Sequence, residues 1–86
     1  MKNIYILEVV NITMGYTVET LYYTNSEIAT KSYSTMIDFI CVEYDAVISK
    51  NLSNSTVYQA VEISNKEIKW GVSLLTETIE KKIFTP

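Results

Sequence analysis

Residues 24–49, TNSEIATKSYSTMIDFICVEYDAVIS, decide the fold, because their pattern predicts one long helix in a chain otherwise rich in strand formers. At about 3.6 residues per turn, one side of this helix carries an apolar stripe typical of packing on a core. The stripe consists of Ala29, Tyr33, Met36, Ile37, Ile40, Tyr44, Val47 and Ile48. Thr24 followed by Glu27 has the capping-box spacing, which predicts a helix from about Asn25 to Ser49.

A second row on another side of this predicted helix follows a 4-3 spacing, the spacing of a helix–helix seam. The row consists of Ile28, Ser32, Thr35, Phe39, Val42, Ala46 and Ser49. A helix on a small sheet needs only one apolar face, so the second row predicts contact with another chain. Phe39 is the expected anchor, because interface energy concentrates in large apolar side chains.

This second row predicts either a homodimer or contact with a different protein, built on Ile28, Phe39, Val42 and Ala46. The charges that flank the row are all negative, from Asp38, Glu43 and Asp45. Like-charge repulsion therefore favours a basic partner unless a second copy keeps these carboxylates at the rim. The alternative is that the row is ordinary core, covered by a curled sheet or by the C-terminal tail.

The segments on either side of the helix predict two hairpins. Residues 3–11 and 16–23 form the first pair around a turn at Gly15, and residues 56–64 and 67–75 form the second. The result is an α+β fold of order ββαββ, a four-stranded antiparallel sheet with one long helix across one face, in a single domain of residues 1–86. Trp70 is expected in the core near Ile40 and Tyr44. Residues 76–86 fit a strand, a helix or a tail, with a strand or extended tail favoured.

Composition excludes several functions. The chain has no histidine and no arginine, and seven lysines against ten acidic residues give a net charge of −3. Histidine is the usual general base and the commonest metal ligand, and arginine is the side chain best suited to bidentate phosphate binding. Because both are missing, we expect no enzyme, no metal and no cofactor. The single cysteine, Cys41, is expected to be a buried inert thiol in a reducing cytoplasm. No signal peptide and no apolar run of about 20 residues is present, so no membrane contact is expected.

The tyrosines leave a second function open. Tyr5, Tyr23 and Tyr58 could stack bases on the sheet surface of a protein that binds single-stranded nucleic acid. The absence of arginine and of a basic patch makes nucleic acid the weaker candidate. The same residues could also be half-buried strand formers or anchors of a protein interface.

Three segments give the chain a resemblance to a class of known proteins. The opening NIYILEVVN (residues 3–11), the strand that leads into a capped helix in YTVETLYYTNSEIA (16–29) and the closing EIKWGV (67–72) together resemble small accessory proteins of bacteriophages and prophages. Several proteins of that class bind and block a host enzyme or immune complex. The resemblance implies an inhibitor that acts on a host protein in the host cytoplasm.

Overall fold

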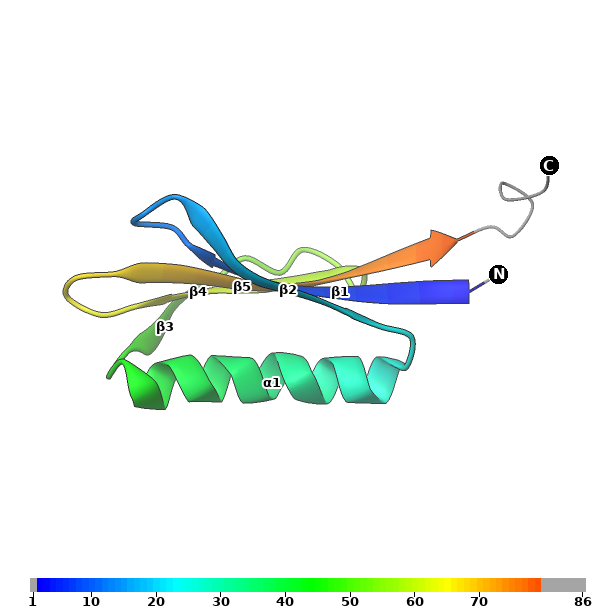
Figure 1. Cartoon of the computed structure of the whole chain (residues 1–86), viewed down its shortest axis with the longest axis horizontal. Helices are drawn as coiled ribbons and strands as arrows, with labels where there is room; N and C mark the ends of the chain where they lie inside the picture. The colour runs from blue at the N-terminus through cyan, green and yellow to red at the C-terminus, as the bar shows by residue number, and fades with distance from the viewer. Residues whose placement is uncertain (1, 80–86) are drawn as a thin grey trace.

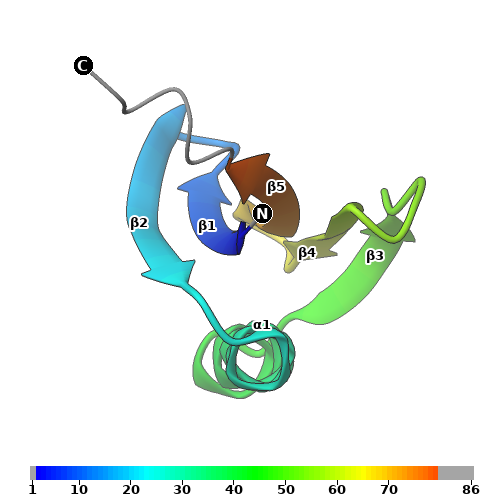
Figure 2. The same cartoon turned by 90° about the vertical axis from the view of Figure 1, so that its right-hand side faces the viewer.

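The computed structural model describes residues 2–79 as one sheet and one helix (Figures 1 and 2). Along the chain these are β1 (Lys2–Asn11), β2 (Tyr16–Tyr23), α1 (Ser26–Glu43), β3 (Val47–Asn51), β4 (Tyr58–Ser64) and β5 (Lys69–Ile79). The strands form a single antiparallel sheet of order β2-β1-β5-β4-β3, and α1 covers one of its faces. Within the described residues, no helix is long and apolar enough to cross a membrane.

The predicted ββαββ order and four-stranded sheet are wrong, because residues 2–79 form five strands in the order ββαβββ. The additional strand, β3, occupies the last part of the predicted helix. Its residues Val47 and Ile48 are β-branched, and β3 pairs with β4 from Val47↔Ser64 to Asn51↔Val61. The other four strands were predicted nearly in place. The favoured strand within residues 76–86 is confirmed as far as Ile79, and residues 80–86 lie outside the described part of the chain.

The helix ends at Glu43 because the chain closes it with a Schellman turn. Tyr44 is the C-cap, and its amide donates to the Ile40 carbonyl at 3.1 Å. Asp45 has a φ of 49°, in the left-handed region, and the Ala46 amide donates back to the Cys41 carbonyl at 3.0 Å. This six-to-one bond reverses the chain direction, and Ala46 becomes buried under the turn.

The helix begins one residue later than the capping box predicted. Asn25 is the N-cap, and its side-chain oxygen accepts a hydrogen bond from the Ile28 amide at 3.0 Å. With Asn25 at this position the third helical residue is Ile28, so Glu27 cannot close a box from Thr24. The Asn25 side chain therefore provides the hydrogen-bond acceptor for one free amide of the first turn, that of Ile28.

The core lies between α1 and the central strands. Leu7 of β1 pairs with Leu74 of β5, and Val9 pairs with Val72, so these four side chains share the face under the helix. Trp70 is 5% exposed, which confirms its predicted burial, and its ring centroid lies 4.9 Å from that of Tyr44 at an interplanar angle of 34°. This buried layer is the base on which the candidate site is built.

Leu7, Leu21 and the tyrosines Tyr5 and Tyr23 lie on the helix-covered side of the sheet. Leu7 is in the core, and Tyr5, Leu21 and Tyr23 pack against it. The reason is that β2 curves towards α1, so its alternate positions and those of β1 complete the helix-covered face (Figure 2).

An apolar groove between β2 and α1

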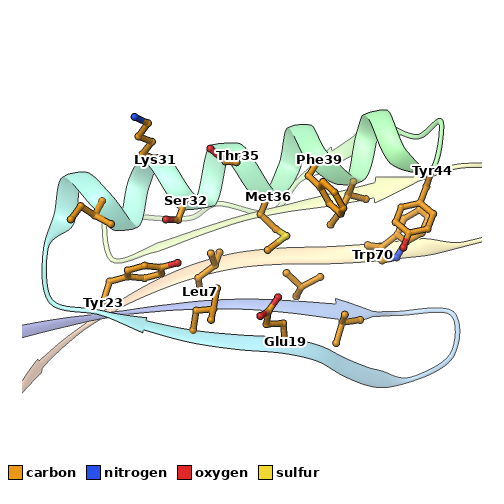
Figure 3. A pocket seen from close by; sticks show the side chains of 15 residues that line it. Leu7, Glu19, Tyr23, Lys31, Ser32, Thr35, Met36, Phe39, Tyr44 and Trp70 are labelled. Atoms are coloured by element: carbon orange, nitrogen blue, oxygen red, sulfur yellow. The ribbon is translucent and has the colours of Figure 1, made fainter.

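An open groove of about 600 Å³ lies between α1 and the β2 side of the sheet (Figure 3). Its floor is the core itself, reached at Leu7, Val9, Ile40 and Trp70. The groove exists because α1 lies over the central strands β1 and β5 and leaves the space beside edge strand β2 partly filled. Apolar side chains on both walls remain in contact with water.

The helical wall is formed by the first part of the second row. Ile28, Ser32, Thr35 and Phe39 all line the groove, and Ile28 and Phe39 are each 55% exposed. Met36, from the predicted core stripe, lies half-buried between this wall and the floor. The 4-3 spacing therefore marked a real exposed face over residues 28–39.

The predicted row continues along the helix to Val42 and ends there, and only its first four members line the groove. Val42 is 82% exposed but does not line the groove, and Ala46 is buried beneath the Schellman turn. Ser49 lies in β3, where its hydroxyl donates to the Glu62 carbonyl at 3.1 Å. Because the helix ends at Glu43, the last two residues of the row cannot contribute to a helical surface.

The strand wall depends on a β-bulge. Val9 pairs with Glu19 and Val10 pairs with Thr17, so Val18 is an extra residue in β2. On a regular strand Val18 and Glu19 would point to opposite faces, but both line the groove, followed at alternate positions by Leu21 and Tyr23. No feature of the sequence marks this bulge, because it depends on how β1 and β2 are paired.

The groove holds one carboxylate and one ammonium group. Figure 3 shows the Glu19 side chain turned from β2 towards Met36, whereas Lys31 extends from the outer side of α1. Among residues 2–79 the one ion pair is Lys69–Glu62 at 4.0 Å, so neither Glu19 nor Lys31 has a charged partner within this part of the chain. Glu19 is thus available to a ligand.

The Phe39 end of the groove is negative. Glu43 follows Phe39 by one helical turn, Asp45 lies just past the helix end, and the last turn of α1 has no basic residue. These carboxylates add to the negative end of the helix dipole. None of the three predicted flanking residues, Asp38, Glu43 and Asp45, lines the groove itself.

The three predicted tyrosines do not form one platform. Tyr5 and Tyr23 pair across β1 and β2 and are half-buried against the core. Tyr58 pairs with Leu75, which in turn pairs with Ile6, so Tyr58 occupies a register position of the opposite sheet face. No stacking surface for single-stranded nucleic acid is built from these residues.

Two titratable side chains, Cys41 and Tyr33, have pKa values that burial raises. Burial, with a smaller effect of Asp38, raises the pKa of the Cys41 thiol, which keeps it protonated and a poor nucleophile near neutral pH. Burial also raises the pKa of Tyr33, against a smaller lowering effect of the Ser53 hydroxyl. The described residues contain no cluster of three or more His, Cys, Asp or Glu side chains that could hold a metal ion.

No protein-family model matches the chain, and its comparison with curated proteins and with solved structures gave no significant match. The groove is therefore interpreted from its own residues.

Proposed function

We propose that this protein is a non-enzymatic protein-binding module whose docking surface is the groove between β2 and α1. The observation that carries the proposal is the exposure of Ile28 and Phe39 beside a groove that opens directly onto the core. Large apolar side chains next to a preformed concavity are typical of interface anchors. Phe39 is the proposed anchor, and the target surface fills the groove.

The shape of the groove favours a protein over a small apolar molecule. Small-molecule sites generally enclose most of the ligand surface. Here the groove is open along the free side of β2, because β2 is an edge strand. A partner that also contacts the rim would bury Phe39 and Ile28 together with the groove floor.

The proposed biological role is that of a phage-type inhibitor that binds and blocks a host protein in the host cytoplasm. The support is the resemblance of three segments to phage accessory proteins and the presence, in residues 2–79, of a packed sheet-and-helix core beside an apolar groove. Such a role requires surface complementarity and no catalytic group.

A second copy of the chain is the competing occupant of the groove, as in the predicted homodimer. A copy carries the same net charge of −3 and the same acidic groups beside Phe39. Because like charges would meet at the rim, we favour a neutral or basic foreign protein.

The proposal is tested by comparing capture from bacterial extract by three proteins: wild type, Phe39→Gln and Val47→Asp. Val47 is the matched control, because it is an exposed apolar residue (68%) on the opposite edge strand. We expect the same bound protein with wild type and Val47→Asp and at least a tenfold loss with Phe39→Gln, with all three showing native circular dichroism.

Equal capture by all three proteins would contradict the groove as the docking surface. Sedimentation of the purified proteins measures their oligomeric state and so shows whether a second copy of the chain occupies the groove. We expect wild type to be a monomer, whereas a dimer that Phe39→Gln dissociates would show that a second copy fills the groove.

A further inference from the structure

We propose that the occupant of the groove is an extended segment of the target that pairs with β2 as a sixth strand and places a basic side chain beside Glu19. This inference rests on the proposed function and specifies its binding mode. It combines three observations on residues 2–79: the edge of β2 that no other described strand pairs with, the path of that edge beside α1, and the Glu19 carboxylate, which has no charged partner among these residues.

The two edges of the sheet differ in how well they are protected from strand addition. β3 is five residues long, carries Lys50 and has a bulge at Ser49, where Ile48↔Ile63 is followed by Lys50↔Glu62. Short length, a lysine and a bulge are common protections of edge strands. β2 has a bulge at Val18 and one charged residue, Glu19, but no lysine and no proline, and its later half, residues 19–23, pairs regularly with β1. This half offers unpaired backbone groups over about 17 Å.

The position of β2 makes this edge part of the groove. Figure 2 shows the sheet curved around α1, with β2 at one edge. A strand added outside β2 would continue this curve and lie along the wall that contains Ile28 and Phe39. Every second side chain of that strand would then face Leu21, Tyr23 and Phe39, whereas the others would face solvent.

The charge at Glu19 specifies one position of the added strand. Its carboxylate lines a groove whose other strand-wall residues are Val18, Leu21 and Tyr23. A lysine or arginine at the groove-facing position opposite Glu19 would neutralise it, and Glu43 adds to the attraction at the same end. A second copy cannot supply this charge through β2, because residues 16–23 contain no basic residue.

The binding mode is tested by selecting peptides from a library of random 12-residue sequences on the folded, immobilised protein. We expect enriched peptides to have apolar residues at alternate positions and one lysine or arginine at a position in the same alternation. Selection on Phe39→Gln should give at least a tenfold lower yield. Selection on Glu19→Lys should replace the basic residue by an acidic one and leave the apolar alternation unchanged.

Three results would overturn strand addition. The first is a spacing of three and four residues between the apolar positions, which indicates a helical ligand. The second is no enrichment of peptides above the Phe39→Gln background. The third is a preference for a basic residue that persists in the selection on Glu19→Lys. Amide exchange gives a second measurement on the complex with the most enriched peptide. Alternate amides among residues 19–23 should become protected, and unchanged exchange there would also overturn the proposal.

These failures can be distinguished from failure of the proposed function. Capture of a target that depends on Phe39, combined with a helical or absent peptide pattern, would remove strand addition and leave the groove as the docking site. Capture that does not depend on Phe39 would remove both.

Discussion

At the residue scale, Asp45 determines where the helix ends. Its φ of 49° lies in the left-handed region, which costs an ordinary L-residue about 1–2 kcal/mol and glycine almost nothing. Its carboxylate also lies near the negative end of the helix dipole. Aspartate adopts this backbone conformation more readily than most residues, so it is tolerated at this position. Glycine would adopt the same conformation at a lower free-energy cost.

Asp45→Gly should consequently stabilise the protein. We expect a gain of about 1 kcal/mol, seen as a rise in melting temperature of about 4–8 °C for a domain of this size. The control is Asp45→Ala, which removes the charge but keeps the Cβ and should be less stable than Asp45→Gly. Thermal unfolding followed by circular dichroism measures both, and an Asp45→Ala protein as stable as Asp45→Gly would contradict the strained turn.

The same residue explains the main error of the prediction from sequence. Val47 and Ile48 fit the helical stripe by spacing, so the helix was extended to Ser49. Spacing alone cannot show that Asp45 adopts a positive φ, because the turn is stabilised by a backbone bond from Ala46 to Cys41 and by pairing of β3 with β4. The β-branched pair after an aspartate was the available signal.

At the element scale, strand alternation determines which side of β5 forms the core. Leu74 faces α1 and is 2% exposed, whereas its neighbour Leu75 belongs to the opposite face and is half-buried. Leu74→Ala should therefore cost about 3 kcal/mol, because it removes three buried carbons and leaves a cavity.

The matched substitution Leu75→Ala changes the same residue type one position further along the strand. It should cost less than half as much, since less apolar surface returns to water. Chemical denaturation with urea measures both, and equal losses would contradict the register in which Leu74 pairs with Leu7.

Alternation in β4 and β5 was predictable because each of these two strands carries its own apolar period. In β1 both faces are apolar, so the sequence did not show which face of β1 and β2 would pack under the helix. The groove was only half predictable for a related reason. Its helical wall follows from the spacing of Ile28, Thr35 and Phe39 within one element. Its strand wall requires the bulge at Val18 and the curvature of β2, which arise from pairing between elements.

At the scale of the whole molecule, residues 2–79 leave edge strand β2 and one flank of α1 incompletely covered on the same side. Edge strand β2 and the Ile28–Phe39 wall meet there, and the buried core residues Leu7, Val9, Ile40 and Trp70 form the floor between them. The opposite edge, β3, is short and interrupted. This asymmetry is the reason that docking is assigned to the β2 side.

The most direct test of this assignment is amide hydrogen exchange of the whole protein, free and bound to the protein that it captures. The account predicts slower exchange in the bound state in two segments, residues 19–23 of β2 and residues 28–39 of α1, with β3 unchanged. The pattern would be absent from the Phe39→Gln protein mixed with the same target. Protection confined to β3, or to the sheet face that carries Tyr58, would contradict the groove as the docking surface.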